Sequence, residues 1–254
     1  MASSDRNTVY VVLGANKGIG LGLVQALLVR PRTTIIATVR PGAPVVSLSE
    51  ACLKTSQGEG TQLHTLAVNF STTTETSALK TLLDHEIRPK VNHVDVFISS
   101  IGHTDVMKPV LETSPRAMRE HFEVNTITPL TWLQAFWPLM GAPLDEAVAA
   151  APTKIFFLSS SVGCIGEWME PMPGGAYGPA KAALNWVVRK LHFELENWVQ
   201  TEMGDIAAKS WNYPGKPPLT VAQSVGGILS LVDGATRENS SGKFLSYDGK
   251  EIPW

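Results

Sequence analysis

Short apolar runs rich in β-branched residues alternate with longer runs of helical period along most of the chain. This alternation is typical of βαβ units built around a parallel sheet. Strands are expected at 9–13, 34–39, 62–68, 94–99 and 154–159, and helices at 18–30, 47–54, 74–85, 115–140 and 177–191. Because most of these strands are apolar throughout, we expect helices to cover both faces of the sheet.

The pattern predicts an α/β fold, a single doubly wound, Rossmann-type domain of three layers over residues 1–254 with a mostly parallel sheet. Ligands of such folds bind at the carboxyl edge of the strands. The segment 203–218 is rich in proline and aromatic residues and matches neither a strand nor a long helix. We expect it to be a substrate loop, with a solvated linker as the alternative.

Composition and charge exclude several classes of protein. The chain has a formal net charge of −2, 17% charged residues and no run of Lys or Arg, so neither nucleic acid nor a membrane surface is an expected partner. No apolar run approaches the roughly 18 residues of a membrane span, and the N-terminus lacks a targeting pattern. The two cysteines, Cys52 and Cys164, do not suggest a disulfide framework. These features predict a cytoplasmic protein without a metal site.

A glycine-rich turn follows the first expected strand and opens directly into an apolar helix at residues 14–20. Glycines at such a turn let phosphates approach the backbone, and the N–H groups at the start of the helix can hold a pyrophosphate. The alternative is a purely structural turn. The cofactor-binding candidates in this turn are Gly14, Asn16, Lys17, Gly18, Ile19 and Gly20.

Two cations near this turn favour a phosphorylated dinucleotide. Arg40 ends the second expected strand, where an enzyme that uses NAD usually presents an acid to the ribose 2′-OH. Lys17 adds a second positive charge, and charge-assisted contacts typically contribute about 1.5–3 kcal/mol each. The predicted cofactor is therefore NADP(H), unless both residues are simply solvated cations.

A serine, a tyrosine and a lysine form the candidate catalytic set. Tyr177 and Lys181 are spaced i, i+4 on one helix face, and a neighbouring cation favours the phenolate, so Tyr177 can act as a general acid. Ser160, or a neighbouring serine at the end of the fifth strand, can orient a ketone. Pro129 cannot donate to the carbonyl of Asn125, which frees that carbonyl for water or a relay unless the proline is only a kink.

Together these motifs resemble the classical short-chain dehydrogenase/reductases, in the same order and over nearly the whole chain. The resemblance implies that Ser160 orients the substrate and that Tyr177 donates the proton. It also implies that Lys181 binds the nicotinamide ribose and that Asn125 holds a relay water. Segments 188–194, 199–204 and 248–254 are similar to the norsolorinic acid ketoreductase group, which reduces ketones of aromatic polyketides.

The chain departs from the family pattern at three places. Ser99-Ser100-Ile101-Gly102 stands where the family has Asn-Asn-Ala-Gly, and Gly102 stays a cofactor-binding candidate. Asn69 replaces an acid that often contacts adenine in the family, and its amide can still bond the ring. The segment before Val199 leaves little room for a sixth strand, which we expect to be missing or degraded. Thr201, similar to the residue that holds the nicotinamide carboxamide, would then be displaced.

The residues and the resemblance predict an NADPH-dependent ketoreductase of secondary metabolism. It would transfer a hydride to the carbonyl of a bulky, aromatic polyketide-like ketone while Tyr177 protonates the oxygen. The alternative is a degenerate scaffold that binds NADP(H) but has lost or redirected its redox chemistry. Flat aromatic and methionine side chains suit a large planar ligand, unless they are plain packing. The residues expected to line the walls of the substrate site are Trp168, Met169, Met172, Trp211 and Tyr213.

The expected helix over 126–140 carries apolar residues beyond the single stripe of a surface helix. A second apolar face needs cover, and helices of this kind pair between subunits in the family that the chain resembles. A homodimer or homotetramer is therefore expected. The residues that spread around the helix are Ile127, Leu130, Trp132, Leu133, Phe136, Trp137 and Leu139.

Overall fold

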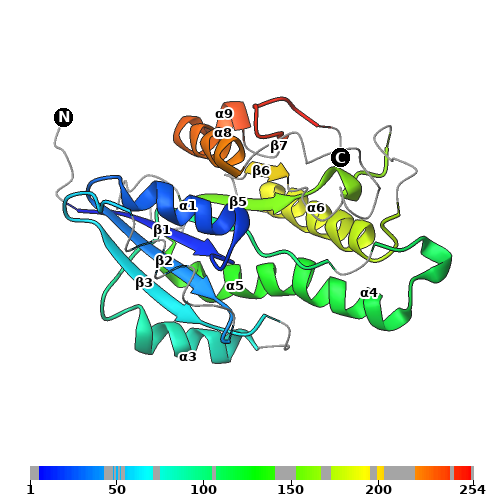
Figure 1. Cartoon of the computed structure of the whole chain (residues 1–254), viewed down its shortest axis with the longest axis horizontal. Coiled ribbons are helices and arrows are strands. Elements are labelled where there is room, and N and C mark those ends of the chain that lie inside the picture. The colour runs from blue at the N-terminus through cyan, green and yellow to red at the C-terminus, as the bar shows by residue number, and fades with distance from the viewer. Residues whose placement is uncertain are drawn as a thin grey trace. The chain divides into compact units, whose positions relative to one another are not determined.

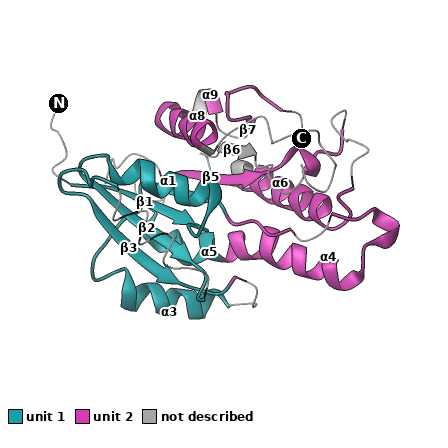
Figure 2. Ribbon diagram, in the orientation of Figure 1, with its two compact units in different colours: residues 1–69, 74–100, 132–153 teal, residues 70–73, 101–131, 154–254 magenta. Residues whose placement is uncertain are grey.

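A computed structural model of the chain divides into two compact units (Figure 2). The first unit comprises residues 1–69, 74–100 and 132–153, and the second comprises 70–73, 101–131 and 154–254. The structure describes residues 6–42, 48, 50, 52, 55–70, 75–104, 107–140, 153–166, 173–194, 199–202, 221–240 and 243–252.

The strands of the first unit are parallel, in the order β3-β2-β1-β4. Figure 1 labels β3, β2 and β1 side by side. They are β1 (Thr8–Leu13), β2 (Thr33–Val39), β3 (Gln62–Ala67) and β4 (Val96–Ser99). All of β2 and β4 and nearly all of β1 are buried, as expected of apolar strands covered on both faces. The chain leaves β1 for β2 on one side and reaches β4 on the other, so a topological switch point lies between β1 and β4.

Helices α1 (Gly18–Leu28) and α3 (Thr76–Glu86) flank these strands in Figure 1. Helix α1 turns an apolar face to the core, since Leu23, Val24 and Leu27 are fully buried. The strands and these two helices confirm the predicted elements to within two residues at most ends. The predicted helix at 47–54 falls mostly outside the described residues.

The second unit contains three parallel strands in the order β5-β6-β7. They are β5 (Lys154–Ser159), β6 (Val199–Glu202) and β7 (Lys243–Phe244). Its helices are α4 (Pro115–Phe122), α6 (Tyr177–Glu194), α8 (Val221–Gly234) and α9 (Arg237–Ser240), with short 3₁₀ turns η1 (Val110–Glu112) and η4 (Ser161–Gly163). The Lys154 ammonium donates to the Val232 carbonyl at 2.7 Å, which places a cation at the C-terminal end of α8. The elements after β6 were not predicted.

The helix predicted over 115–140 is interrupted in its middle. Helix α4 ends at Phe122, and a π-helical turn, η2 (Glu123–Ile127), separates it from α5 (Thr128–Phe136) and the 3₁₀ turn η3 (Trp137–Leu139). The N–H of Thr128 donates to the carbonyl of Glu123, five residues earlier. Pro129 explains the wider turn, because it has no N–H to donate to the carbonyl four residues before it.

The sixth strand, which the sequence analysis expected to be missing or degraded, is present but short. Strand β6 pairs with β5 in parallel, with Thr201 opposite Leu158, and with β7 on its other side. Helix α6 runs antiparallel to the strands of a βαβ unit, so its end already lies near the start of the next strand. The polar segment at 199–202 forms the strand itself.

The apolar side chains of 126–140 are mostly buried within the chain. Phe136 is fully buried, with its ring 6.0 Å from that of Phe97 and 5.9 Å from that of Trp132. Ile127, by contrast, is 45% exposed. The spread of apolar residues around this helix therefore reflects packing inside the molecule, and most of these side chains need no second copy of the chain to cover them.

None of the helices in the described part of the chain is both long and apolar enough to cross a membrane. The predicted substrate loop at 203–218 lies outside the described residues, as do the expected wall residues Trp168, Met169, Met172, Trp211 and Tyr213.

Candidate active site

The glycine turn after β1 has the backbone conformation that its sequence predicts. Gly14 and Gly18 have φ angles of +82° and +58°, in the left-handed region that favours glycine. A Cβ at Gly20 would overlap the carbonyl oxygen of Gly14 and lie 3.0 Å from the hydroxyl of Ser100. At Gly18, in contrast, no described atom lies within 4 Å of the position that a Cβ would take. Gly20 thus packs α1 against the strands, while Gly18 leaves an open face.

Side-chain and backbone hydrogen bonds hold this turn against the end of β2. The N–H of Gly14 donates to the Thr38 hydroxyl at 3.0 Å, and the N–H of Arg40 donates to the side-chain oxygen of Asn16 at 2.7 Å. Lys17, at the N-cap of α1, and Arg40 are both exposed. An open glycine, a helix start and two cations beside one turn fit the phosphates of a dinucleotide.

The structure also shows the positions after β3 and β4 at which the chain departs from the family pattern. Ser100, which stands where the family has an asparagine, is buried, and its hydroxyl lies 3.0 Å from the position that a Cβ on Gly20 would take. Asn69 and Gly102, two further cofactor-binding candidates, are exposed. A small hydroxyl side chain therefore fills the space beside the turn.

Tyr177 and Lys181 occupy the first two turns of α6 in the second unit. The Lys181 ammonium lies 5.8 Å from the centre of the Tyr177 ring and donates to the Leu158 carbonyl at 2.9 Å. Lys181 has no exposed surface, and this burial lowers the pKa of its ammonium to about 7. Tyr177 packs with Met107 and Val162.

Ser160 begins the turn η4, which packs against α6. Its hydroxyl accepts a hydrogen bond from the N–H of Val162 at 3.3 Å. Glycines allow the close approach, because a Cβ at Gly163 would lie 2.9 Å from the backbone nitrogen of Ala182 and one at Gly178 would lie 2.9 Å from the Val162 carbonyl oxygen. The serine turn and the Tyr/Lys helix are therefore in direct contact.

Asn125 lies in the π-helical turn and is fully buried. Its side-chain oxygen accepts from the N–H of His103 at 2.7 Å, and its amide donates to the His103 carbonyl at 2.8 Å. The side chain thus shapes the loop after β4. The next residue, Thr126, donates to the Ala180 carbonyl at 2.7 Å, beside Lys181.

These contacts place Ser160, Tyr177, Lys181 and Asn125 on elements that pack together in the second unit. Thr201 lies in β6, and Thr126, His103 and Asn185 join the surroundings of the set although the sequence analysis did not single them out. The available signal for Asn185 was a polar residue between Leu184 and Val188, two apolar residues on the buried face of α6.

An open sheet with a glycine turn after its first strand, together with a buried Ser, Tyr and Lys set, defines a dinucleotide-dependent oxidoreductase. The short chain dehydrogenase family model matches residues 8–203. The chain therefore belongs to the short-chain dehydrogenase family and is an oxidoreductase.

Individual relatives cover nearly the whole chain. Norsolorinic acid ketoreductase nor1 of Dothistroma septosporum is 34% identical over 263 residues, which cover 98% of this chain and 94% of the relative. The NADPH-bound carbonyl reductase from chicken fatty liver is 25% identical, with a TM-score of 0.75 over 98% of this chain and 100% of that one. The carbonyl reductase Sniffer of D. melanogaster, 23% identical, covers the same shares with a TM-score of 0.78 and supports the fold.

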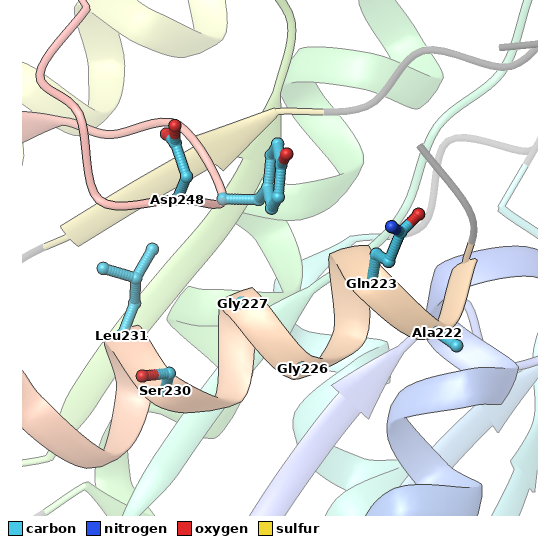
Figure 3. A pocket seen from close by; sticks show the side chains of 8 residues that line it. Ala222, Gln223, Gly226, Gly227, Ser230, Leu231 and Asp248 are labelled. Atoms are coloured by element: carbon cyan, nitrogen blue, oxygen red, sulfur yellow. The ribbon is translucent and has the colours of Figure 1, made fainter. Parts of the chain in front are cut away.

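A separate hollow lies on α8 (Figure 3), and its lining includes none of the predicted catalytic residues. It is open to solvent and has a volume of about 460 Å³. Its lining comes from α8 and from the turn that carries Tyr247 and Asp248, and the α8 residues are Ala222, Gln223, Gly226, Gly227, Ser230 and Leu231. A Cβ at Gly227 would overlap the Tyr247 carbonyl oxygen, so a glycine lets the turn approach the helix.

Proposed function

We propose that this chain is an NADPH-dependent ketoreductase that acts on a bulky, aromatic polyketide-like ketone. The observation that carries the proposal is the fully buried Lys181 beneath Tyr177, with the Ser160 turn packed against the same helix. The name of the Dothistroma relative supports a polyketide ketone as the substrate class.

Each of the three side chains has a role that its surroundings support. The Ser160 hydroxyl accepts from a backbone N–H, so its own hydrogen is left to donate to the substrate carbonyl. The Tyr177 phenol gives a proton to that oxygen. Lys181, with a pKa lowered to about 7, can return a proton to the tyrosinate near neutral pH. NADPH, when bound, supplies the hydride.

Asn125 acts in this proposal by fixing the loop that follows β4. Both hydrogen-bonding groups of its side chain bind the His103 backbone, so the implied relay water would have to use the Asn125 backbone instead. Thr201 remains the candidate for binding the nicotinamide carboxamide, and it lies in strand β6 rather than in a loop.

The preference for NADPH rests on Arg40 and Lys17. We expect NADPH to bind at least about tenfold more tightly than NADH, which corresponds to about 1.4 kcal/mol. The Arg40→Asp variant should lose most of this preference, because a carboxylate repels the 2′-phosphate and can accept from the ribose 2′-OH. Titration calorimetry with both cofactors measures it, with Lys80→Asp on the exposed face of α3 as a charge-matched control. Equal affinities in the wild type would refute the assignment.

Two finer features are proposals that accompany this function. The first is a homodimer or homotetramer, for which Ile127, 45% exposed, is the remaining support from the helix over 126–140. The second is a location in the cytoplasm, which rests on the sequence. The degenerate scaffold is not proposed, because its ground was a missing sixth strand and β6 is present.

A further inference from the structure

Asn185 connects the serine turn to the Tyr/Lys helix through its side chain. It lies on α6 one turn after Lys181 and is 4% exposed. Its side-chain oxygen accepts from the Ser159 hydroxyl, and its amide nitrogen donates to the Gly163 carbonyl at 3.5 Å. One amide thus spans both ends of the segment 159–163, which contains Ser160.

The segment that Asn185 spans contains a single 3₁₀ turn, η4, whose Ser160 and Ser161 carbonyls accept from the N–H groups of Gly163 and Cys164. Within it the N–H of Gly163 donates to the Ser160 carbonyl at 3.0 Å, in a single 3₁₀ turn of the kind that is weak in isolation. The Ser160 hydroxyl accepts a further bond from the Val162 N–H at 3.3 Å. The position of Ser160 therefore depends on what holds the turn from outside.

A buried amide is costly unless both its groups are bonded, and an apolar side chain would suit the surroundings. Leu184 and Val188, the neighbours of Asn185 on the buried face of α6, are apolar and 1% and 2% exposed. The amide at this position is thus explained by the two bonds that it makes to Ser159 and Gly163.

We propose that Asn185 is a positioning residue for ketone reduction: it clamps the segment 159–163 to α6 and thereby sets the location of the Ser160 hydroxyl relative to the Tyr177 phenol. The inference rests on the proposed function. A shift of about 1 Å in a reacting group can lower a rate about 10²-fold, so the clamp should act on turnover more than on cofactor binding.

The kinetic test compares Asn185→Leu, which keeps the volume, with Ser159→Ala, which removes only the donor hydroxyl. Both should lower kcat by roughly 10–100-fold and leave the KM for NADPH within about twofold. The double variant should be no slower than Asn185→Leu alone, because the same bond is lost in each. Val188→Ala, a buried change one turn further along α6, should lower the melting temperature without lowering kcat.

A measurement without turnover tests the clamp directly. Hydrogen exchange of the Gly163 and Cys164 amides, which donate to Ser160 and Ser161, should accelerate in Asn185→Leu and Ser159→Ala but not in Val188→Ala. Unchanged exchange, or kcat values equal to that of Val188→Ala, would overturn the proposal. If Asn185→Leu does not fold, Ser159→Ala decides the outcome. A wild type that oxidises no NADPH with any ketone refutes the proposed function, whereas the exchange result still decides the clamp.

Discussion

Lys181 is a basic side chain with no exposed surface, and its ammonium donates to the carbonyl of Leu158. Burial disfavours the charged form, which is why the pKa falls to about 7 from an ordinary value of 10.5. A lysine that exchanges a proton near neutral pH suits the proposed reduction, in which the Tyr177 phenolate must regain a proton. The same shift of the Lys181 pKa lowers the free energy of unfolding, so the shift can be measured through the stability of the protein.

The free energy of unfolding should rise with pH because of this lysine. Below pH 7 the folded and unfolded states both hold the proton, so the penalty of the buried charge is fully present. Between about 7 and 10.5 the unfolded state holds one more proton, and stability should rise by at most about 1.4 kcal/mol per pH unit. Urea unfolding at pH 7, 8 and 9 measures the free energy of unfolding of the wild type minus that of Lys181→Met, a signed difference that should rise with pH. A difference that does not vary with pH would contradict the shift.

At the residue scale, the sequence predicted the groups whose spacing carries chemistry. Tyr177 and Lys181 fall on one helix face, and Gly18 and Gly20 fall in the turn as expected. Thr126 was not predicted, because its partner is the Ala180 carbonyl and nothing in the local sequence marks a backbone partner. The bond of Asn125 to the His103 backbone was hidden for the same reason. Asn185 was not predicted either, although it is a polar residue between the buried Leu184 and Val188.

At the scale of elements, glycines decide how closely helices approach their neighbours. Gly20 on α1 and Gly226 on α8 are both helical glycines, but only Gly20 has a neighbouring backbone atom where a Cβ would lie. The two therefore form a matched pair for the same substitution.

Gly20→Ala should lower the free energy of unfolding by about 1–3 kcal/mol, because the new methyl group forces α1 away from Gly14. It should also weaken NADPH binding, since the turn that holds the phosphates moves. Gly226→Ala should instead raise the free energy of unfolding by up to about 1 kcal/mol, as alanine favours the helix and its methyl group meets no atom of the described residues within 4 Å. Urea titrations of both variants provide the comparison, and equal effects would show that the close approach at Gly20 is not a constraint.

Elements also show where sequence reasoning failed. The helix predicted over 115–140 is one periodic pattern, but Pro129 introduces the π-helical turn, whose wider bonding leaves no trace in the hydrophobic period. The sixth strand was expected to be missing or degraded because the segment before Val199 leaves little room for it. Strand β6 forms instead from Val199–Glu202, and its pairing with β5 and β7 comes from the sheet rather than from propensity.

For the whole molecule, the fold class and the family could be predicted because the glycine turn and the Tyr/Lys pair stand in a fixed order along the chain. The family model over 8–203 and relatives that cover 98% of the chain confirm this prediction. Oligomeric state could not be predicted equally well, because the hydrophobic pattern does not distinguish a side chain buried within the chain, such as Trp132, from one covered by a second copy.

Turnover by Tyr177→Phe tests the central claim most directly. The substitution removes only the phenol oxygen and keeps the ring that packs on Met107 and Val162. Wild-type protein should oxidise NADPH with polycyclic aromatic ketones faster than with small polar ones, and the variant should lose at least about 10²-fold in kcat while its Kd for NADPH changes less than about twofold. Ketone reduction by Tyr177→Phe at the wild-type rate would contradict the assignment of Tyr177 as the proton donor.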